Sequence, residues 1–373
     1  MDIPFIDLKA QYLRLQSEIS SGIDKVFEHG QFIMGPEVFE LERRLAKFAG
    51  VNRAVTCSSG TDALLMTLMA LNVGRGDAVF TSPFTFFATA EVISLLGATP
   101  VFVDIDSRTF NIDPSQLEKK IDFVKKENNL KPACVIPVDL FGLPADYDNI
   151  KSVTEDNGLF VLEDAAQSFG AEYKGRKAGS LGGAAALSFF PAKPLGCYGD
   201  GGAVLTDDED LAYEMESIRV HGQGDDKYSN SRIGLNARFD TIQAAALLPK
   251  LGIFPDELID RRKVANRYTE GLEGYVETPV VPDQFQSAWA QYSVMSESRS
   301  QIRAALKAGG APTAVYYPTP LHLQKAFSSL GHKKGDFPVT ESVAGKIFSL
   351  PMSPYLTDDQ QNKIIHIIKR SVI

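Results

Sequence analysis

The sequence has few residues that could cross-link the chain through disulfides or a structural metal. Its 373 residues include three cysteines, which form no C-x-x-C pair, and five scattered histidines. Both counts argue against a disulfide framework or a zinc site, and we expect no bound metal. An uninterrupted apolar stretch of about 18 residues is also missing, so no transmembrane helix is expected.

Positive charge is scarce as well. The chain has 38 lysines and arginines against 47 aspartates and glutamates, a formal net charge of −9. This balance provides no basic surface for nucleic acid or an anionic membrane, and we expect neither as a partner. An anionic substrate must therefore be bound by local cations. Because the N-terminal M-D-I-P-F-I-D-L-K lacks the basic and apolar regions of a signal peptide, we expect a cytoplasmic enzyme or binding protein.

The apolar residues indicate two helices followed by alternating strands and helices. Three- and four-residue spacing predicts a first helix, and a second helix begins after Gly35-Pro36 and ends at Gly50. Helical patterns then alternate with seven short apolar runs, typical of buried strands: 54–57, 78–82, 100–104, 134–138, 159–163, 187–190 and 203–206. This alternation predicts an α/β fold with a mainly parallel seven-stranded sheet between helices.

The pattern changes near Leu247. A charged helix is predicted over 256–272, followed by a segment rich in β-branched and aromatic residues and then by shorter helices. We therefore predict a large α/β domain over 1–247, which includes the N-terminal helices, and a smaller α+β domain over 248–373.

The segment S-S-G-T-D-A-L-L at 58–65 follows a predicted strand and begins a helix. Backbone N–H groups at a helix start are unpaired, and the helix dipole favours an anion such as phosphate there. The same residues also suit a simple N-cap made by Ser59 or Thr61, and the motif alone favours the cap. The glycine patterns of dinucleotide-binding folds and P-loops are absent.

Two further segments carry groups suited to a cofactor. In V-L-E-D-A-A-Q-S-F-G-A at 161–171, Asp164 ends an apolar strand, where it could hold a protonated ring nitrogen or cap the loop. In S-F-F-P-A-K-P-L-G at 188–196, Lys193 lies among prolines and phenylalanines. Most lysines are surface charges, but one with apolar neighbours has a lowered pKa and can attack a carbonyl, so both roles are open.

A fourth segment, S-P-F-T-F-F-A-T-A at 82–90, follows another strand, and its rings could join the core or stack on a planar ligand. In this order, the four segments resemble the DegT/DnrJ/EryC1/StrS family of pyridoxal-phosphate-dependent nucleotide-sugar aminotransferases, which have fold type I. The resemblance runs nearly from end to end, from F-I-D-L-K at 5–9 to S-L-P-M-S-P-Y-L at 349–356.

The resemblance implies a complete site for pyridoxal 5'-phosphate, with pyridoxamine phosphate as its intermediate form. Lys193 would form the Schiff base with the aldehyde and carry the proton, and Asp164 would pair with the pyridinium nitrogen. The other expected contacts are Gly60, Thr61, Asp62 and Ser188 at the phosphate, Gln167 at the phenolic oxygen, Phe86 on the ring face, and Asn236 reaching the phosphate from a neighbouring subunit.

The resemblance also implies a substrate site that contains Arg238, Tyr316, Tyr317 and His322. Most relatives begin the last segment with H-Y-P, whereas this chain has Y-Y-P-T-P-L-H at 316–322, so the role of that histidine does not transfer directly to Tyr316. The family's sugar dehydratases have histidine in place of Lys193, and the lysine therefore favours amino transfer.

The implied enzyme moves an amino group, with glutamate as the expected donor, onto a nucleotide-linked ketosugar, and it is a homodimer with shared active sites. The runs 191–203 and 290–292 are most similar to enzymes acting at C3 of UDP-2-acetamido-2-deoxy-3-ketoglucuronic acid, in polysaccharide or lipopolysaccharide biosynthesis. One alternative is a C3 or C4 aminotransferase for a dTDP- or UDP-ketodeoxysugar. Another is a catalytically silent cofactor-binding regulator.

Overall fold

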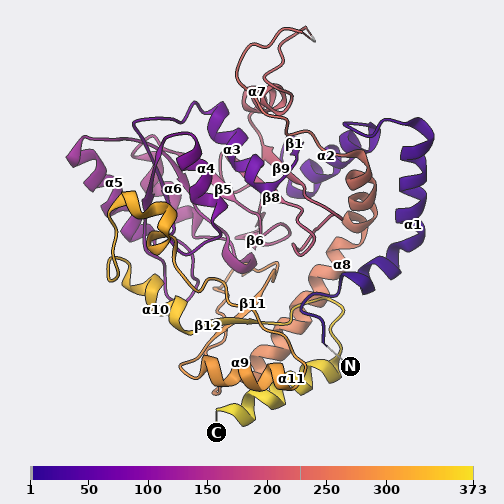
Figure 1. Ribbon diagram of the computed structural model, residues 1–373, viewed down its shortest axis with the longest axis vertical. Helices are drawn as coiled ribbons and strands as arrows, with labels where there is room; N and C mark the ends of the chain where they lie inside the picture. The colour runs from indigo at the N-terminus through magenta and orange to yellow at the C-terminus, as the bar shows by residue number, and fades with distance from the viewer. Residues whose placement is uncertain (1–2, 227, 373) are drawn as a thin grey trace.

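The centre of the molecule is a mainly parallel sheet (Figure 1). The computed structural model describes residues 3–226 and 228–372. Within these ranges the sheet has seven strands: β1 (Arg53–Cys57), β2 (Asp77–Thr81), β3 (Thr99–Phe102), β4 (Lys131–Ile136), β5 (Phe160–Asp164), β8 (Ala184–Ser188) and β9 (Gly202–Thr206). Their order is β1-β9-β8-β5-β4-β2-β3. β9 is antiparallel to both of its neighbours, and the other pairings are parallel. All seven predicted strands are confirmed to within three residues at each end.

Helices cover both faces of this sheet, which explains why its strands are apolar throughout. Neighbouring residues of a strand point to opposite faces, so Ala186 packs in one core and Leu187 in another. The first core includes α3 (Gly60–Ala70), α4 (Ala88–Leu95) and α7 (Glu209–Arg219). The opposite face packs on α2 (Pro36–Ala49), α5 (Pro114–Glu127), α6 (Tyr147–Glu155) and the first half of α8 (Thr241–Leu272). The predicted α/β fold is therefore confirmed.

The two N-terminal helices are present as predicted, whereas α8 is longer than predicted. α1 (Leu8–His29) packs along α8, and Gly50 ends α2 with a φ of 79°. The helix predicted to begin at residue 256 begins at Thr241 instead. Pro249 and Pro255 lie inside it, although proline ordinarily removes a helical hydrogen bond and breaks the helix. Burial of the apolar stripe of α8 against the sheet keeps the helix continuous.

The C-terminal part of the chain has a core of its own. β11 (Tyr292–Met295) pairs with β12 (Ile347–Leu350), and α9 (Arg299–Ala308) and α11 (Asp358–Ser371) pack beside them and the second half of α8. Because α8 contributes to both cores, the predicted boundary at 247/248 lies inside a helix, and the division into two domains stays a prediction. The remaining elements are β6 (Glu172–Tyr173), β7 (Arg176–Lys177), β10 (Phe285–Gln286), α10 (Pro338–Lys346) and the 3-10 turns η1 (Leu140–Gly142), η2 (Leu321–Leu323) and η3 (Lys325–Leu330).

The connection between α7 and α8 extends away from the rest of the molecule as a loop (Figure 1). Its two arms approach each other at Gln223 and Asn230, and its return arm leads to Asn236 and Arg238. Across the described ranges, none of the helices combines the length and the apolar character that crossing a membrane requires.

Candidate active site

A cavity of about 680 Å³ lies at the carboxyl ends of β5 and β8, where open α/β sheets place their ligands. Its walls come from the start of α3, the loop before α4, the ends of the two strands, and the chain on either side of η2. The cavity brings together nine of the predicted site residues: Gly60, Thr61, Phe86, Asp164, Gln167, Ser188, Lys193, Tyr316 and Tyr317.

Lys193 lies on a short loop that follows β8. Its backbone N–H donates to the carbonyl of Phe190 at 2.8 Å, which makes the loop a tight turn. The side chain is partly exposed to the cavity, and the surrounding protein atoms lower its pKa by burial. The charge of Asp164 acts in the opposite direction, because a nearby anion favours the ammonium form. A lysine in this environment is more readily available as a neutral amine than a surface lysine.

Asp164 ends β5 and is only 4% exposed. Its carboxylate accepts hydrogen bonds from the Thr89 hydroxyl at 2.9 Å and from the Ala166 N–H at 3.3 Å. Burial raises the pKa of Asp164, while both hydrogen bonds and the charge of Lys193 lower it. The site thus holds a buried carboxylate and a desolvated amine that influence each other's ionisation.

The start of α3 combines the two roles that the sequence left open. The Ser59 hydroxyl caps the helix by accepting from the Asp62 N–H at 3.0 Å. Asp62 does not line the cavity, and its carboxylate accepts from the hydroxyls of Ser58 and Ser59. Across the described ranges, the N–H groups of Gly60 and Thr61 have no hydrogen-bond partner, so this turn can still bind an anion.

Ser188 lies directly against this turn. A Cβ atom added to Gly60 would be 2.7 Å from the Ser188 Cβ, closer than real Cβ contacts allow. Glycine at position 60 therefore lets the α3 amides and the Ser188 hydroxyl approach the same space. Two free N–H groups with adjacent hydroxyls from Thr61 and Ser188 have the chemistry that a phosphate group requires.

Polar and aromatic side chains form the remaining walls. Gln167 accepts from the Phe141 N–H at 2.8 Å through Oε1, and its Nε2 donates to the Tyr317 hydroxyl at 3.4 Å. These bonds fix the amide orientation of Gln167. Burial raises the pKa of both Tyr316 and Tyr317. Phe86 is 58% exposed at the cavity, where its ring can cover a planar ligand.

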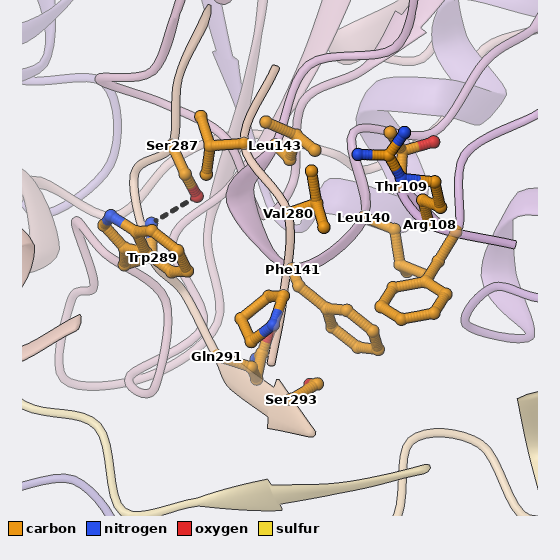
Figure 2. Close-up of a pocket in the computed structure, with 13 residues that line it drawn as sticks. Arg108, Thr109, Leu140, Phe141, Leu143, Val280, Ser287, Trp289, Gln291 and Ser293 are labelled. Carbon is orange, nitrogen blue, oxygen red and sulfur yellow. Dashed lines mark hydrogen bonds between the residues drawn. The ribbon is translucent and has the colours of Figure 1, made fainter. Parts of the chain in front are cut away.

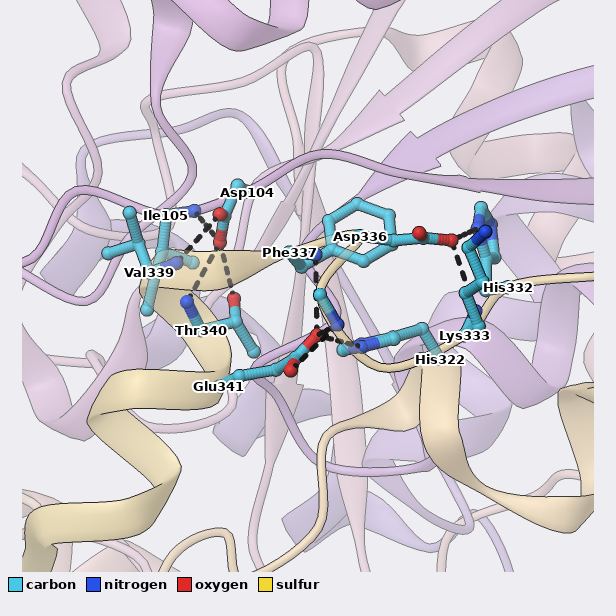
Figure 3. Close-up of polar contacts among 11 residues, drawn as sticks. Asp104, Ile105, His322, His332, Lys333, Asp336, Phe337, Val339, Thr340 and Glu341 are labelled. Atoms are coloured by element: carbon cyan, nitrogen blue, oxygen red, sulfur yellow. Dashed lines mark hydrogen bonds and ion pairs between the residues drawn. The ribbon is translucent and has the colours of Figure 1, made fainter.

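Three predicted residues besides Asp62 lie outside the cavity lining. Asn236 and Arg238 follow the extended loop, and the Arg238 Nε donates to the Asn236 Oδ1 at 3.0 Å. His322 is buried, and its Nε2 lies 3.1 Å from Glu341 Oε1 (Figure 3). Within this single chain, the structure therefore does not bring Asn236, Arg238 or His322 to the cavity.

A polar network anchors the chain segment that forms one cavity wall (Figure 3). Glu341, the partner of His322, also accepts from the N–H groups of Gly335 and Phe337. Asp104 follows β3 and accepts from the N–H groups of Val339 and Thr340. The segment from His322 to Glu341 is thus attached both to itself and to the edge of the central sheet.

Two residues of the cavity wall, Thr89 and Gln291, were not predicted as site residues from the sequence. Thr89 supports Asp164, and its position within the aromatic segment 82–90 was the available signal. Gln291 lines the large cavity and also a second cavity of about 20 Å³, which Trp289 and Phe141 line as well (Figure 2). Its Oε1 is buried without a partner in the described part of the chain.

The backbone beside Gln291 explains the glycine at position 142. Gly142 has a φ of 100°, and an added Cβ would be 2.8 Å from the Trp289 nitrogen. Its carbonyl accepts from the Ala288 N–H at 2.9 Å. This close approach holds the 288–291 segment against the turn that also donates to Gln167.

The chain is similar to known sugar aminotransferases over almost its whole length. It is 49% identical to the UDP-2-acetamido-2-deoxy-3-oxo-D-glucuronate aminotransferase of Pseudomonas aeruginosa, covering 97% of this chain and 98% of the relative. It is also 43% identical to a protein of Geobacillus stearothermophilus named a pleiotropic regulatory protein, covering 98% and 97%.

Solved structures agree with the sequence comparisons. A DegT/DnrJ/EryC1/StrS aminotransferase from Brucella abortus superposes with a TM-score of 0.97 at 48% identity, covering 99% of both chains. A putative sugar aminotransferase from Streptococcus pneumoniae, solved in a PMP form, has a TM-score of 0.89 at 27% identity and 95% coverage of both chains. The match to the family itself spans residues 14–369. The chain therefore belongs to the DegT/DnrJ/EryC1/StrS aminotransferase family.

Proposed function

We propose that this protein is a pyridoxal-phosphate-dependent aminotransferase that transfers an amino group from glutamate to C3 of UDP-2-acetamido-2-deoxy-3-ketoglucuronic acid. The observation that carries the proposal is the arrangement of Lys193 and Asp164 around one cavity, beside the free amides of α3. The name of the relative at 49% identity supports this substrate.

The residues of the cavity fit the cofactor. Gly60, Thr61 and Ser188 would hold the phosphate, because the start of α3 offers free N–H groups and hydroxyls. Asp164 would hold the ring nitrogen, and Gln167 would contact the phenolic oxygen. Bound there, pyridoxal phosphate supplies an aldehyde and a protonated ring that withdraws electrons from the carbon being deprotonated.

The chain's own groups would perform the proton transfers. Lys193 would accept a proton from the donor's α-carbon and return it to C4′ of the cofactor. Its lowered pKa favours the neutral amine that this role requires. Asp164 can hold a proton on a ring nitrogen as long as it is ionised, and Thr89 favours that ionised form. Phe86 and the two tyrosines would cover a bound cofactor ring and limit the access of water to it.

The charge of the substrate supports a second chain at the site. Among the described residues that line the cavity, Lys193 is the sole cation, whereas a nucleotide diphosphate linked to a uronic acid carries several negative charges. We propose a homodimer in which Arg238 and Asn236 of each chain complete the partner's site. The exposed rings of Phe27 and Phe32, 5.7 Å apart, support an apolar subunit interface. The three free, buried cysteines are compatible with the reducing cytoplasm.

The proposal is tested with the two half-reactions. Glutamate alone should convert the cofactor-loaded protein to the pyridoxamine phosphate form and release an equivalent amount of 2-oxoglutarate. Subsequent addition of the UDP-3-ketouronic acid should restore the starting absorbance and yield the amino sugar, detected by mass spectrometry. The matching 3-ketosugar without the carboxylate should react at least about tenfold less efficiently, since a charged hydrogen bond is lost.

Two alternatives have distinct outcomes. A preference for a dTDP- or UDP-ketodeoxysugar would leave the enzyme class intact but replace the proposed substrate. Protein that binds the cofactor yet releases no 2-oxoglutarate would support a silent regulator, a class suggested by the name of the relative at 43% identity.

A further inference from the structure

A second lysine, Lys250, is buried beneath the loop that carries Lys193. Lys250 lies on α8 and is 1% exposed, between the apolar residues Leu247 and Phe254. Its Nζ donates to the Gly196 carbonyl at 2.7 Å and lies 3.7 Å from the centre of the Tyr198 ring. Among the described residues, Lys250 forms no ion pair with a carboxylate within 4.0 Å. Burial lowers the pKa of Lys250 to about 8.

The loop that Lys250 contacts is compact. The Cys197 N–H donates to the Phe189 carbonyl at 2.8 Å, which closes the loop around Lys193. A Cβ atom added to Gly196 would be 2.5 Å from the Pro191 carbonyl oxygen, so glycine is required there. Lys250 therefore attaches to a loop residue that is packed directly against the opposite side of the turn.

Stability alone does not explain a lysine in this position. The charge of Glu257, two turns further along α8, favours the ammonium form of Lys250, but burial outweighs it and lowers the pKa. Burying an ammonium group without an anion in direct contact is unfavourable, and an apolar side chain of similar length would fill the same space without that cost. What the lysine adds is a long donor that reaches a carbonyl three residues beyond Lys193, on an element 54 residues away in the chain. The Tyr198 ring face partly compensates the buried charge.

We propose that Lys250 is a positioning residue that fixes the Lys193 loop through the Gly196 carbonyl. The catalytic consequence of this role rests on the proposed function, whereas the effect on the loop does not. Loss of the hydrogen bond releases the 189–197 loop and lets the Lys193 amine leave its position in the cavity wall. A small displacement of this kind is enough to slow a reaction that depends on close alignment.

The loop is tested first by hydrogen exchange of the purified full chain, measured by mass spectrometry. Lys250→Met keeps the length of the side chain and removes the donor, and it should speed exchange in peptides covering 189–197 by about tenfold or more. Lys263→Met is the matched control, because Lys263 lies exposed on the same helix and forms an ion pair with Asp260, one turn away on the surface. The control should leave exchange in this loop unchanged. Unchanged exchange in a folded Lys250→Met protein would overturn the proposal.

A second readout connects the loop to the reaction. In the loaded protein, Lys250→Met should lower kcat by about 10- to 100-fold with little change in KM, and should shift the pH at which the visible absorbance of the Lys193 adduct titrates. Lys250→Arg keeps a charged donor and should recover part of the lost kcat and part of the titration shift. It also replaces the methionine variant in this test if that protein does not fold. Wild-type activity and an unshifted titration in both variants would contradict positioning. Wild-type protein without any visible absorbance would instead contradict the proposed function, and the exchange result would still stand.

Discussion

The hydroxyl of Thr89 donates to the Asp164 carboxylate at 2.9 Å, joining the start of α4 to the end of β5. The bond lowers the pKa of a carboxyl group that burial alone would raise. Because only the ionised carboxylate can hold a proton on a ring nitrogen, Thr89 extends the pH range in which the site works toward acid.

Thr89→Val should therefore shift the acidic limb of the pH profile of kcat to higher pH. The sign follows from the pKa of Asp164. Without the Thr89 donor this pKa rises, so the carboxylate becomes protonated at a higher pH than in the wild type. Thr67→Val is the control, since Thr67 is equally buried but donates to the Ala63 carbonyl inside α3. An unshifted limb in Thr89→Val would show that this bond does not tune Asp164.

Asp164→Asn should retain the cofactor but lose turnover by about 100-fold or more. An amide cannot stabilise the positive charge on the ring nitrogen, whereas the phosphate contacts at α3 are untouched. Cofactor retention is measured by absorbance after dialysis and turnover by 2-oxoglutarate release. Near wild-type turnover would mean that Asp164 only supports the fold.

Glu341→Ala should weaken both the fold and substrate binding. The change leaves the buried His322 Nε2 without its acceptor, which costs about 1–3 kcal/mol of unfolding free energy. Since Leu321 and Gln324 of the same segment line the cavity, KM for the sugar should rise by about tenfold. Denaturant unfolding and initial rates provide the two measurements.

Two variants control this prediction. Glu341→Gln keeps an acceptor for His322 and should remain close to wild type. Asp336→Ala removes the carboxylate 3.5 Å from His332, a pair that is more exposed than His322–Glu341. It should lower the free energy of unfolding by less than about 1 kcal/mol. Equal KM values in Glu341→Ala and wild type would show that the network serves stability alone.

The shared site is tested by mixing Lys193→Ala with Asn236→Ala protein and allowing the subunits to exchange. If Asn236 acts in the partner's site, each mixed dimer has one site with both lesions and one with neither. Activity should then rise above that of either parent, toward roughly a quarter of wild type for random pairing. Confirmed exchange without recovered activity would place Asn236 in its own chain's site.

Local sequence predicted the strands and the loops at their ends, but it did not predict contacts between distant residues. Asp164 ends an apolar strand and Lys193 lies in the loop after another, but position alone left the roles of both open, and the family resemblance assigned them. β8 was predicted three residues too late, because Ala184, Ala185 and Ala186 have little strand propensity and form a strand through burial between helices.

The partners that support the site could not be found in this way. Thr89 and Asp164 are 75 residues apart, and Lys250 and Gly196 are 54 apart. Only the folded sheet and the full length of α8 bring these pairs together. Pro249 and Pro255 concealed that length, since a helix ordinarily ends near such residues.

The central claim is that Lys193 carries the cofactor. Borohydride reduction of the loaded protein, followed by proteolysis and mass spectrometry, tests this most directly, because reduction makes the link to the lysine permanent. We predict that the label is found on Lys193, with the other lysines, including the buried Lys250, unlabelled. A label on a different lysine, or no label on protein saturated with pyridoxal phosphate, would contradict the account.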